Sequence, residues 1–312
     1  MNICVVGYGS IGKRHTDILS SKGHNLTIVS KQENLPFESY TNLQTALDNN
    51  KNSFDLIIIA TPTSKHAESL KTLNANKFIG KILIEKPIAA ASYELADIDF
   101  NVLRTQTFVG YNLRFHPLIQ FIKKELQNQT ILSFHAYVGQ YLPTWRPNQN
   151  YKESYSAHKN LGGGVLRDLS HELDYAIWLL GQWTKLTAQV QKASDLEIDT
   201  DDQVAVLFQT KRCPSGTIIL NYNDQITQRK ITINTFDKTF EIDLINNKVQ
   251  INNDTRLIPV PRNETYKLML EDILQNNTTN LCSIDEGLNI LNLIESIEKA
   301  SKEEIWVTNP SI

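Results

Sequence analysis

The first segment that could do chemistry is G-x-G-x-x-G at residues 7 to 12, directly after the strand-like run Ile3 to Val6. In this motif the first glycine makes a tight turn, the second lets a pyrophosphate approach the backbone, and the third lets helix and strand pack closely. The helix that begins here would offer unpaired N–H groups to the phosphates. A glycine-rich turn without a ligand is the alternative. The predicted dinucleotide-binding residues of this loop are Gly7, Gly9, Ser10, Ile11 and Gly12.

The end of the second predicted strand bears on the choice between NAD and NADP. A fold that binds NAD usually carries an acidic residue about 20 positions after the glycines, bonded to the ribose hydroxyls. Here Ser30 and Lys31 stand at the strand tip, and Arg14 adds a second positive charge. These residues favour NADP through its 2′-phosphate. Glu33 would favour NAD if it reached the ribose, and a plain surface lysine is the other interpretation of Lys31.

A candidate acid/base follows the apolar run Lys81 to Ile84, in the sequence Glu85-Lys86-Pro87. If a bound dinucleotide exchanges a hydride with an alcohol, a nearby group must exchange the hydroxyl proton. Lys86 would lie at the carboxyl end of a parallel strand, where partial burial and the positive nicotinamide would lower its pKa toward neutrality. Glu85 would hydrogen-bond the cofactor or hold Lys86. A lysine that only faces solvent is the alternative.

A second candidate acid/base follows the triple glycine 162 to 164. Asp168, His171 and Asp174 are spaced three residues apart, which predicts that they share one face of a helix. The glycines would allow close approach of the chain to the substrate or the nicotinamide. His171 would exchange the substrate proton, and Asp168 would bind sugar hydroxyls or orient the ring. The alternative is a core histidine bonded to a backbone carbonyl.

Cationic and aromatic side chains after residue 110 indicate a substrate pocket. The planar fork of Arg114 suits a carboxylate or a phosphate. Four aromatic side chains after residue 139, Tyr141, Trp145, Tyr151 and Tyr155, offer a stacking surface for a ring of the substrate, although each alone would more often be packing. The predicted substrate-binding residues are Asn112, Arg114, Tyr141, Trp145, Arg146 and Asp174.

Strands and helices must alternate over the first part of the chain to position these residues. Short runs rich in Ile, Val and Leu indicate buried parallel strands, and apolar residues three and four apart indicate helices. The alternation predicts a doubly wound parallel sheet. The predicted strands are Ile3 to Val6, Leu26 to Val29, Phe54 to Ala60, Lys81 to Ile84 and Thr107 to Gly110, and the predicted helices are 11 to 22, Leu43 to Leu47, His66 to Ala75 and Ser92 to Leu103.

After about residue 120 strands follow one another with little helix between them, which predicts an α+β domain with a large, mostly antiparallel sheet. Asn246-Asn247 is typical of a type I′ hairpin turn. We expect a dinucleotide-binding domain at 1–118 and a second domain at 119–312. The predicted elements of the second domain are strands Ile131 to Val138, Leu186 to Gln191, Gln203 to Gln209, Gly216 to Asn221, Lys230 to Thr235, Thr239 to Leu244 and Lys248 to Ile251, and helices Tyr266 to Gln275 and Ile284 to Ala300.

The composition of the 312 residues excludes several classes of protein. Hydrophobic residues make up 41 % and charged residues 21 %, which is too apolar for a disordered chain. A net charge of −3 gives no reason to expect nucleic acid as a partner. The apolar runs are too short to span a membrane, and the N-terminal residues lack a signal-peptide pattern, so we expect a cytoplasmic protein. Three scattered cysteines and the His, Asp and Glu spacings predict neither disulfides nor a metal site.

Further motifs occur in a fixed order: Ala60-Thr61-Pro62 with His66, Glu85-Lys86-Pro87, Gly110 to Phe115 (GYNLRF), and the triple glycine with its aspartates and His171. With them the sequence resembles the glucose–fructose oxidoreductase / inositol dehydrogenase / rhizopine-catabolism (Gfo/Idh/MocA) family over essentially its full length. The segment from Val138 to Pro147 is also similar to members encoded among bacterial genes for surface-glycan sugars.

The resemblance implies an NAD(P)-dependent oxidoreductase acting on a secondary alcohol or ketone of a sugar or sugar nucleotide, and a homodimer or homotetramer. It implies that Thr61, Pro62 and His66 line the nicotinamide ribose, that Arg114 faces the substrate, and that the Lys86–Pro87 bond is cis. One departure is that the family usually has four residues from the aspartate to the histidine, where this chain has three. The alternative function is a non-catalytic dinucleotide-binding regulator. We expect the open face of the second sheet to be covered by a partner subunit. Its strands carry an apolar face, although the spacing does not show on which side that face packs; the residues are Val204, Val206, Phe208, Ile218 and Leu220.

Overall fold

The computed structural model describes residues 1–146 and 149–310, and the chain divides into two compact units. Unit 1 consists of Met1–Tyr111 and Tyr266–Leu291, and unit 2 of Asn112–Thr265 and Asn292–Ile312. The sequence predicts a boundary at residue 118, with a second domain over 119–312. The structural division differs because the chain returns to unit 1, where strand β15 (Cys282–Ser283) pairs with β6 (Thr107–Val109).

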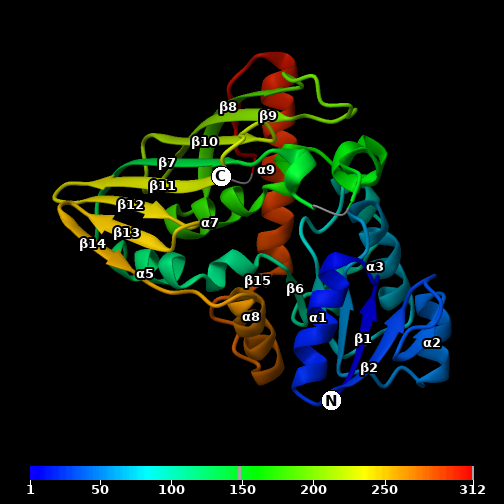
Figure 1. The fold of residues 1–312 in the computed structure, drawn as a ribbon. Helices are drawn as coiled ribbons and strands as arrows, with labels where there is room; N and C mark the ends of the chain where they lie inside the picture. The colour runs from blue at the N-terminus through cyan, green and yellow to red at the C-terminus, as the bar shows by residue number, and fades with distance from the viewer. Residues whose placement is uncertain (147–148, 311–312) are drawn as a thin grey trace. The chain divides into compact units, whose positions relative to one another are not determined.

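Unit 1 is built on a seven-stranded sheet in the order β15-β6-β5-β4-β1-β2-β3 (Figure 1). Every neighbouring pair is parallel except β15 with β6, which confirms the predicted Rossmann-type sheet. The central strand β4 is buried along its whole length, as a strand covered on both faces must be. Besides β6 and β15, the strands of this sheet are β1 (Asn2–Val6), β2 (Asn25–Val29), β3 (Glu38–Tyr40), β4 (Leu56–Ile59) and β5 (Lys81–Ile84).

The helices of unit 1 follow the prediction with one exception. The helix expected over Ser92 to Leu103 is instead a 3₁₀ turn, Ser92–Leu95, followed by the single turn α4 (Phe100–Leu103). Asp99 interrupts the helix because its carboxylate accepts the backbone N–H of Asn101 and starts a new helix there. The remaining helices of this unit are α1 (Ser10–Ser21), α2 (Leu43–Asn49) and α3 (His66–Ala75), while α8 (Glu264–Gln275) and α9 (Ile284–Glu303) each run from one unit into the other.

Unit 2 is built on a nine-stranded sheet in the order β14-β13-β12-β11-β7-β10-β9-β8-β16 (Figure 1). Only β7 with β10 is parallel, which confirms a mostly antiparallel sheet. The strands are β7 (Ile131–Gly139), β8 (Trp183–Gln191), β9 (Gln203–Thr210), β10 (Gly216–Asn221), β11 (Gln228–Thr235), β12 (Thr239–Asp243), β13 (Lys248–Ile251), β14 (Asp254–Leu257) and β16 (Val307–Thr308), and the helices are α5 (Pro117–Glu125), α6 (Val165–Asp168) and α7 (His171–Leu180).

The turn between β12 and β13 is not the predicted type I′ turn. A type I′ turn needs positive φ at both central residues. Asn247 has φ +53°, whereas Asn246 is not among the positive-φ residues. The Asp243 carboxylate accepts the backbone N–H groups of Ile245 and Asn246, which holds a longer connection between the paired residues Asp243 and Lys248.

The apolar face of β9 and β10 belongs to the core of unit 2. Its residues are buried within this single chain, Val206 being 4 % exposed and Leu220 not at all, and α6 packs against both strands. These residues therefore face the core, and the expected contact with a partner subunit would have to use the opposite side of the sheet. Alternation shows that a strand has an apolar face but not what covers it. Over the described part of the chain, no helix is long and apolar enough to cross a membrane.

Candidate functional site

The glycine loop joins β1 to α1 in unit 1. Gly7 has φ +97°, and a Cβ on it would lie 2.6 Å from the carbonyl oxygen of Ala60. A Cβ on Gly12 would lie 1.9 Å from the carbonyl oxygen of Gly7, whereas one on Gly9 would meet nothing within 4 Å. The fold therefore requires the first and third glycines but not the second. At the start of α1 no side chain caps the helix, and Ser10 is exposed and Ile11 half-buried. The backbone N–H groups of these two residues can therefore bind an anion.

The segment after β4 lies against this loop. The backbone nitrogen of Thr61 would be 2.8 Å from a Cβ on Gly7. Among the described residues, the Thr61 hydroxyl is one of the buried polar groups without a hydrogen-bond partner. Pro62 is exposed and precedes a 3₁₀ turn that has no side-chain cap, so Thr61 does not serve as a helix cap. An unpartnered buried hydroxyl beside the glycine loop fits the polar groups of a dinucleotide.

The segment after β5 carries Lys86, which is half-buried, and the Lys86–Pro87 peptide bond is cis. Glu85 is 8 % exposed, and its Oε1 lies 2.8 Å from Nε2 of the buried His15. His66 is buried as well, and its two ring nitrogens lie 2.9 Å and 3.0 Å from the carbonyl oxygens of Pro87 and Thr61. Glu85 and His66 are thus both engaged inside unit 1, and burial lowers the pKa of His66.

The residues predicted to read the adenosine ribose lie on the loop after β2. Lys31 and Glu33 are both exposed. The Ser30 hydroxyl accepts the backbone N–H of Gln32 at 3.1 Å and so closes the local turn. The Arg14 guanidinium lies over the ring of Tyr266, 4.9 Å from its centroid. Of the three residues that favoured a 2′-phosphate, only Lys31 projects from the surface with no other role in the fold.

In unit 2, Asp168 and His171 lie on two successive helices rather than on one. Helix α6 ends at Asp168, Leu169 breaks the helical geometry with φ −100° and ψ +25°, and α7 begins at His171. The predicted single helical face of Asp168, His171 and Asp174 is therefore wrong. Asp168 belongs to a turn that starts at Gly164, and Asp174 to one that starts at Ser170.

Two tyrosines hold the Asp168 carboxylate. The Tyr222 hydroxyl donates to Asp168 Oδ2 at 2.7 Å, and the Tyr155 side chain also hydrogen-bonds Asp168. Burial raises the pKa of both tyrosines, so both stay protonated and act as donors. Sequence reasoning did not identify Tyr222, and it named Tyr155 only as one aromatic residue among several. Tyr222 follows β10 without any local motif that would mark it.

The predicted anion site at Arg114 is occupied by a side chain of the chain itself. Arg114 is 2 % exposed and donates through Nε and Nη2 to Asp174, with a shortest distance of 2.7 Å. Asn112 is also buried and donates to the Thr265 hydroxyl at 2.6 Å. Arg114 and Asp174 form a buried ion pair that supports α7, so the structure does not leave their charges for a substrate.

The triple glycine has a packing role in unit 2. A Cβ on Gly163 would lie 2.2 Å from the carbonyl oxygen of Tyr155, and one on Gly164 would lie 2.2 Å from Oδ1 of Asp201. Gly164 also has φ +112°. Gly163 lets the α6 segment pack against the loop that carries Tyr155, and Gly164 lets it pack against Asp201. The close approach to a substrate stays a prediction.

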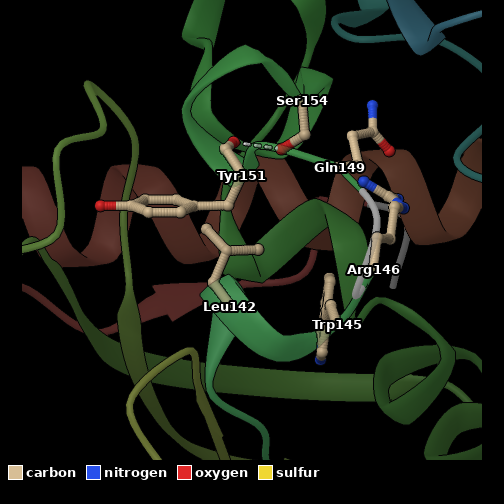
Figure 2. A pocket seen from close by; sticks show the side chains of 6 residues that line it. All are labelled: Leu142, Trp145, Arg146, Gln149, Tyr151 and Ser154. Atoms are coloured by element: carbon tan, nitrogen blue, oxygen red, sulfur yellow. Dashed lines mark hydrogen bonds between the residues drawn. The ribbon is translucent and has the colours of Figure 1, made fainter.

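A small, shallow pocket opens on the loop after β7 (Figure 2). Trp145 and Arg146 contribute to its wall, and Tyr141 lies just before it on the chain. Trp145 packs edge-on against the ring of Tyr222, 5.2 Å between centroids, and Arg146 lies over the ring of Tyr155 at 5.3 Å. The pocket therefore adjoins the two tyrosines that hold Asp168. Its lining residues are Leu142, Trp145, Arg146, Gln149, Tyr151 and Ser154.

Two protein-family models match the chain, one in each unit. The model of a family described as "Oxidoreductase family, NAD-binding Rossmann fold" matches residues 1–107, and that described as "GFO/IDH/MocA C-terminal domain" matches residues 125–242. The chain belongs to the Gfo/Idh/MocA family of oxidoreductases. The resemblance inferred from the motifs is thereby confirmed.

Individual relatives are more distant. Levoglucosan dehydrogenase of Pseudarthrobacter phenanthrenivorans is 29 % identical over 141 residues, which is 43 % of this chain and 35 % of that protein. A structure of a levoglucosan dehydrogenase in complex with NADH matches all of both chains at 19 % identity, with a TM-score of 0.85. The WlbA dehydrogenase of Bordetella pertussis, in complex with NADH and UDP-GlcNAcA, matches 99 % of this chain and 98 % of its own at 18 % identity, with a TM-score of 0.81. These structural likenesses establish the fold.

Proposed function

We propose that the protein is an NAD(H)-dependent oxidoreductase that transfers a hydride between nicotinamide and a secondary alcohol or ketone of a sugar or sugar nucleotide. One observation carries this proposal. Gly7, Thr61 and Lys86 follow β1, β4 and β5 within two residues, and these strands are neighbours in the parallel sheet. Open α/β sheets bind ligands at this carboxyl edge.

The first unit would hold the cofactor with residues that already fit it. The open backbone at Gly9 and the uncapped start of α1 suit the pyrophosphate, and the unpartnered Thr61 hydroxyl suits a ribose hydroxyl. When bound, the nicotinamide accepts or supplies the hydride. Lys86 then takes the proton from the substrate oxygen in oxidation, or returns it in reduction.

The second unit would bind the sugar. Asp168, fixed by two tyrosine hydroxyls, accepts hydrogen bonds from sugar hydroxyls, while His171 at the start of α7 serves as a second proton carrier. Arg146 has no carboxylate partner among the described residues and lies over Tyr155, so it would bind an anionic group of the substrate. The neighbouring structures that hold levoglucosan and UDP-GlcNAcA support a sugar or sugar nucleotide as the substrate class.

We propose NAD(H) as the cofactor in preference to NADP(H). The family description and the neighbouring structures with NADH support this choice. The residues first taken to favour NADP are partly engaged elsewhere, since Ser30 closes its own turn and Arg14 stacks on Tyr266. Of the three residues, only Lys31 could still bind a 2′-phosphate.

Calorimetric titration of the cofactor-stripped protein with NADH and NADPH, followed by turnover assays on a panel of sugars and sugar nucleotides, tests this function. The proposal expects NADH binding and NADH formation from NAD⁺ with at least one member of the panel. If NADH binds but no member is oxidised or reduced, the regulatory alternative replaces the enzyme. If neither dinucleotide binds, the glycine loop is structural.

We also propose that the chain forms a homo-oligomer through the solvent-facing side of the unit 2 sheet. Leu132, Leu207 and Ile219, on β7, β9 and β10, are 41 %, 39 % and 37 % exposed in the single chain. Burying such side chains in a subunit contact would remove apolar surface from water. Light scattering of the purified protein tests this, because a monomer mass at all concentrations contradicts it.

A further inference from the structure

Lys86 stands between two residues that are each tied to a buried histidine. Glu85 precedes it and is held through its side chain, while Pro87 follows it and is held through its backbone carbonyl. The two histidines come from different elements, His15 from α1 and His66 from the start of α3. Neither has a part in the hydride transfer outlined above.

The contact to Glu85 is fully enclosed. His15 is 0 % exposed, its Nε2 is 2.8 Å from Glu85 Oε1, and its Nδ1 has no hydrogen-bond partner among the described residues. The proton on the ring must therefore stand on Nε2 for the ring to donate to the carboxylate. On the other side, a Cβ on Gly110 would lie 3.0 Å from Glu85 Oε2, so the carboxylate is confined between His15 and the backbone.

Tyr266 covers this pair from a distant part of the chain. Its ring packs edge-on against His15, with 5.5 Å between centroids, and carries Arg14 on its face. Tyr266 is the first residue of the segment that returns to unit 1. The returning segment thus shields the His15–Glu85 hydrogen bond, and a shielded bond to a charged group is stronger than an exposed one.

The contact to Pro87 joins two loops. His66 Nδ1 lies 2.9 Å from the Pro87 carbonyl oxygen, and Nε2 lies 3.0 Å from that of Thr61. Burial favours the neutral ring, which has one N–H and donates to only one of these two carbonyls; with the proton on Nδ1 that carbonyl is the one of Pro87. The ring packs between the segments that follow β4 and β5 and in this way bridges them. Both segments would contact the dinucleotide, so the bridge fixes the backbone on which Lys86 stands relative to the Thr61 hydroxyl.

We propose that His15 and His66 are positioning residues that fix Lys86 from its two sides. This inference rests on the proposed role of Lys86 as the proton-exchanging group. A lysine side chain has four rotatable bonds, and immobilising the backbone on both sides restricts where its amine can reach. A proton-transfer group must lie within hydrogen-bond reach of the substrate oxygen, so loosening either side lowers the rate of the chemical step more than the affinity for NADH.

The test uses His66→Leu and His15→Leu, each with a variant that restores the donor. The amide nitrogen of Asn matches imidazole Nδ1, so His66→Asn can still donate to Pro87, and that of Gln matches Nε2, so His15→Gln can still donate to Glu85. His24→Leu, a half-buried histidine of the same unit outside the network, is the matched control. Circular dichroism and the midpoint of thermal unfolding establish that each variant is folded.

The first readout is the ¹³C NMR signal of Lys86 after reductive methylation of the lysines, assigned by its absence in Lys86→Arg. We expect the Leu variants to move the chemical shift of Lys86 toward that of the exposed lysines. We expect the Asn, Gln and His24→Leu variants to resemble the wild type. An unchanged Lys86 signal in folded His66→Leu and His15→Leu overturns the positioning role.

The second readout separates this inference from the proposed function. With a substrate in hand, kcat should fall about tenfold or more in the Leu variants while the Kd for NADH stays within about twofold, and the Asn and Gln variants should recover most of the rate. If Lys86→Arg itself retains full turnover, the catalytic role of Lys86 fails, whatever the histidine variants do. If Lys86→Arg is inactive but the Leu variants keep full kcat, the positioning role alone fails.

Discussion

The two units assemble their candidate residues in different ways. In unit 1 these residues follow neighbouring parallel strands within two positions, so the sheet order alone brings Gly7, Thr61 and Lys86 to one edge. In unit 2 the carboxylate of Asp168 depends on Tyr155 and Tyr222, which come from a loop and from the residue after β10. Local motifs therefore reveal the first set, whereas the second depends on contacts between distant segments.

The largest effect that we expect comes from Lys86→Met, which keeps an unbranched side chain one atom shorter and removes its proton-exchanging amine. Turnover should fall by about 10²- to 10⁴-fold, the usual contribution of a general acid or base, while NADH binding stays within about twofold. Steady-state kinetics and calorimetry measure the two. Turnover close to that of the wild type would remove Lys86 from the chemistry and leave unit 1 with cofactor binding only.

The glycine loop offers a matched pair of alanine substitutions. A Cβ on Gly12 would overlap the carbonyl oxygen of Gly7, so Gly12→Ala should lower the free energy of unfolding by about 2–4 kcal/mol. A Cβ on Gly9 meets open space, so Gly9→Ala should change that free energy by less than about 0.5 kcal/mol but weaken NADH binding. Urea unfolding and calorimetry measure both. Unchanged NADH affinity in Gly9→Ala would contradict the phosphate-binding role of the loop.

The tyrosines of unit 2 test whether Asp168 needs its distant partners. Tyr222→Phe and Tyr155→Phe each remove one donor to a buried carboxylate, and each should lower the free energy of unfolding by about 1.5–3 kcal/mol. The double variant should deviate from additivity because both hydroxyls serve the same carboxylate. Denaturant unfolding measures the cycle. Strict additivity would mean that the two hydrogen bonds act independently, against the account of a shared anchor.

Asp201 gives unit 2 a pH dependence of its own. Its carboxylate accepts the Leu166 N–H at the start of α6, and burial raises its pKa from 3.8 to about 6. The folded state therefore binds the proton more tightly, so this contribution to stability is full below the ordinary pKa and is lost as pH rises through about 6. Asp201→Asn should remove that fall.

The measurement is the free energy of unfolding of the wild type and Asp201→Asn between about pH 4 and pH 7. His116, whose pKa burial lowers to about 4, titrates with the opposite sign but in both proteins alike, so the difference between the curves isolates Asp201. Parallel curves would contradict a raised pKa at Asp201.

Lys31→Ala should have the smallest effect. Lys31 is exposed on the loop after β2. Its removal should leave the free energy of unfolding nearly unchanged and the Kd for NADH within about twofold. NADPH affinity should also change little, because a single exposed lysine, without Ser30 and Arg14 beside it, contributes little to binding a 2′-phosphate. Paired calorimetric titrations check this. Tight NADPH binding that collapses in the variant would restore NADP as the cofactor.

The difference between the units also explains what could be predicted. Periodicity and composition predicted the parallel sheet, the glycine motif predicted the loop after β1, and the family resemblance implied the cis bond before Pro87. They did not predict that Arg114 is neutralised by Asp174, 60 residues away, nor that Leu169 breaks the helix between Asp168 and His171. Neither property has a local signal, because the first depends on tertiary pairing and the second on how α6 packs through Gly163 and Gly164.

The central claim is that the chain is an NAD(H)-dependent sugar dehydrogenase with Lys86 as its proton-exchanging group. The most direct test follows NADH formation by absorbance when the protein and NAD⁺ are mixed with a panel of sugars and sugar nucleotides, beside Lys86→Met. The account predicts NADH formation with at least one member of the panel and its loss in the variant. NADH that binds to the wild type without turnover on any member, or equal turnover in both proteins, would contradict it.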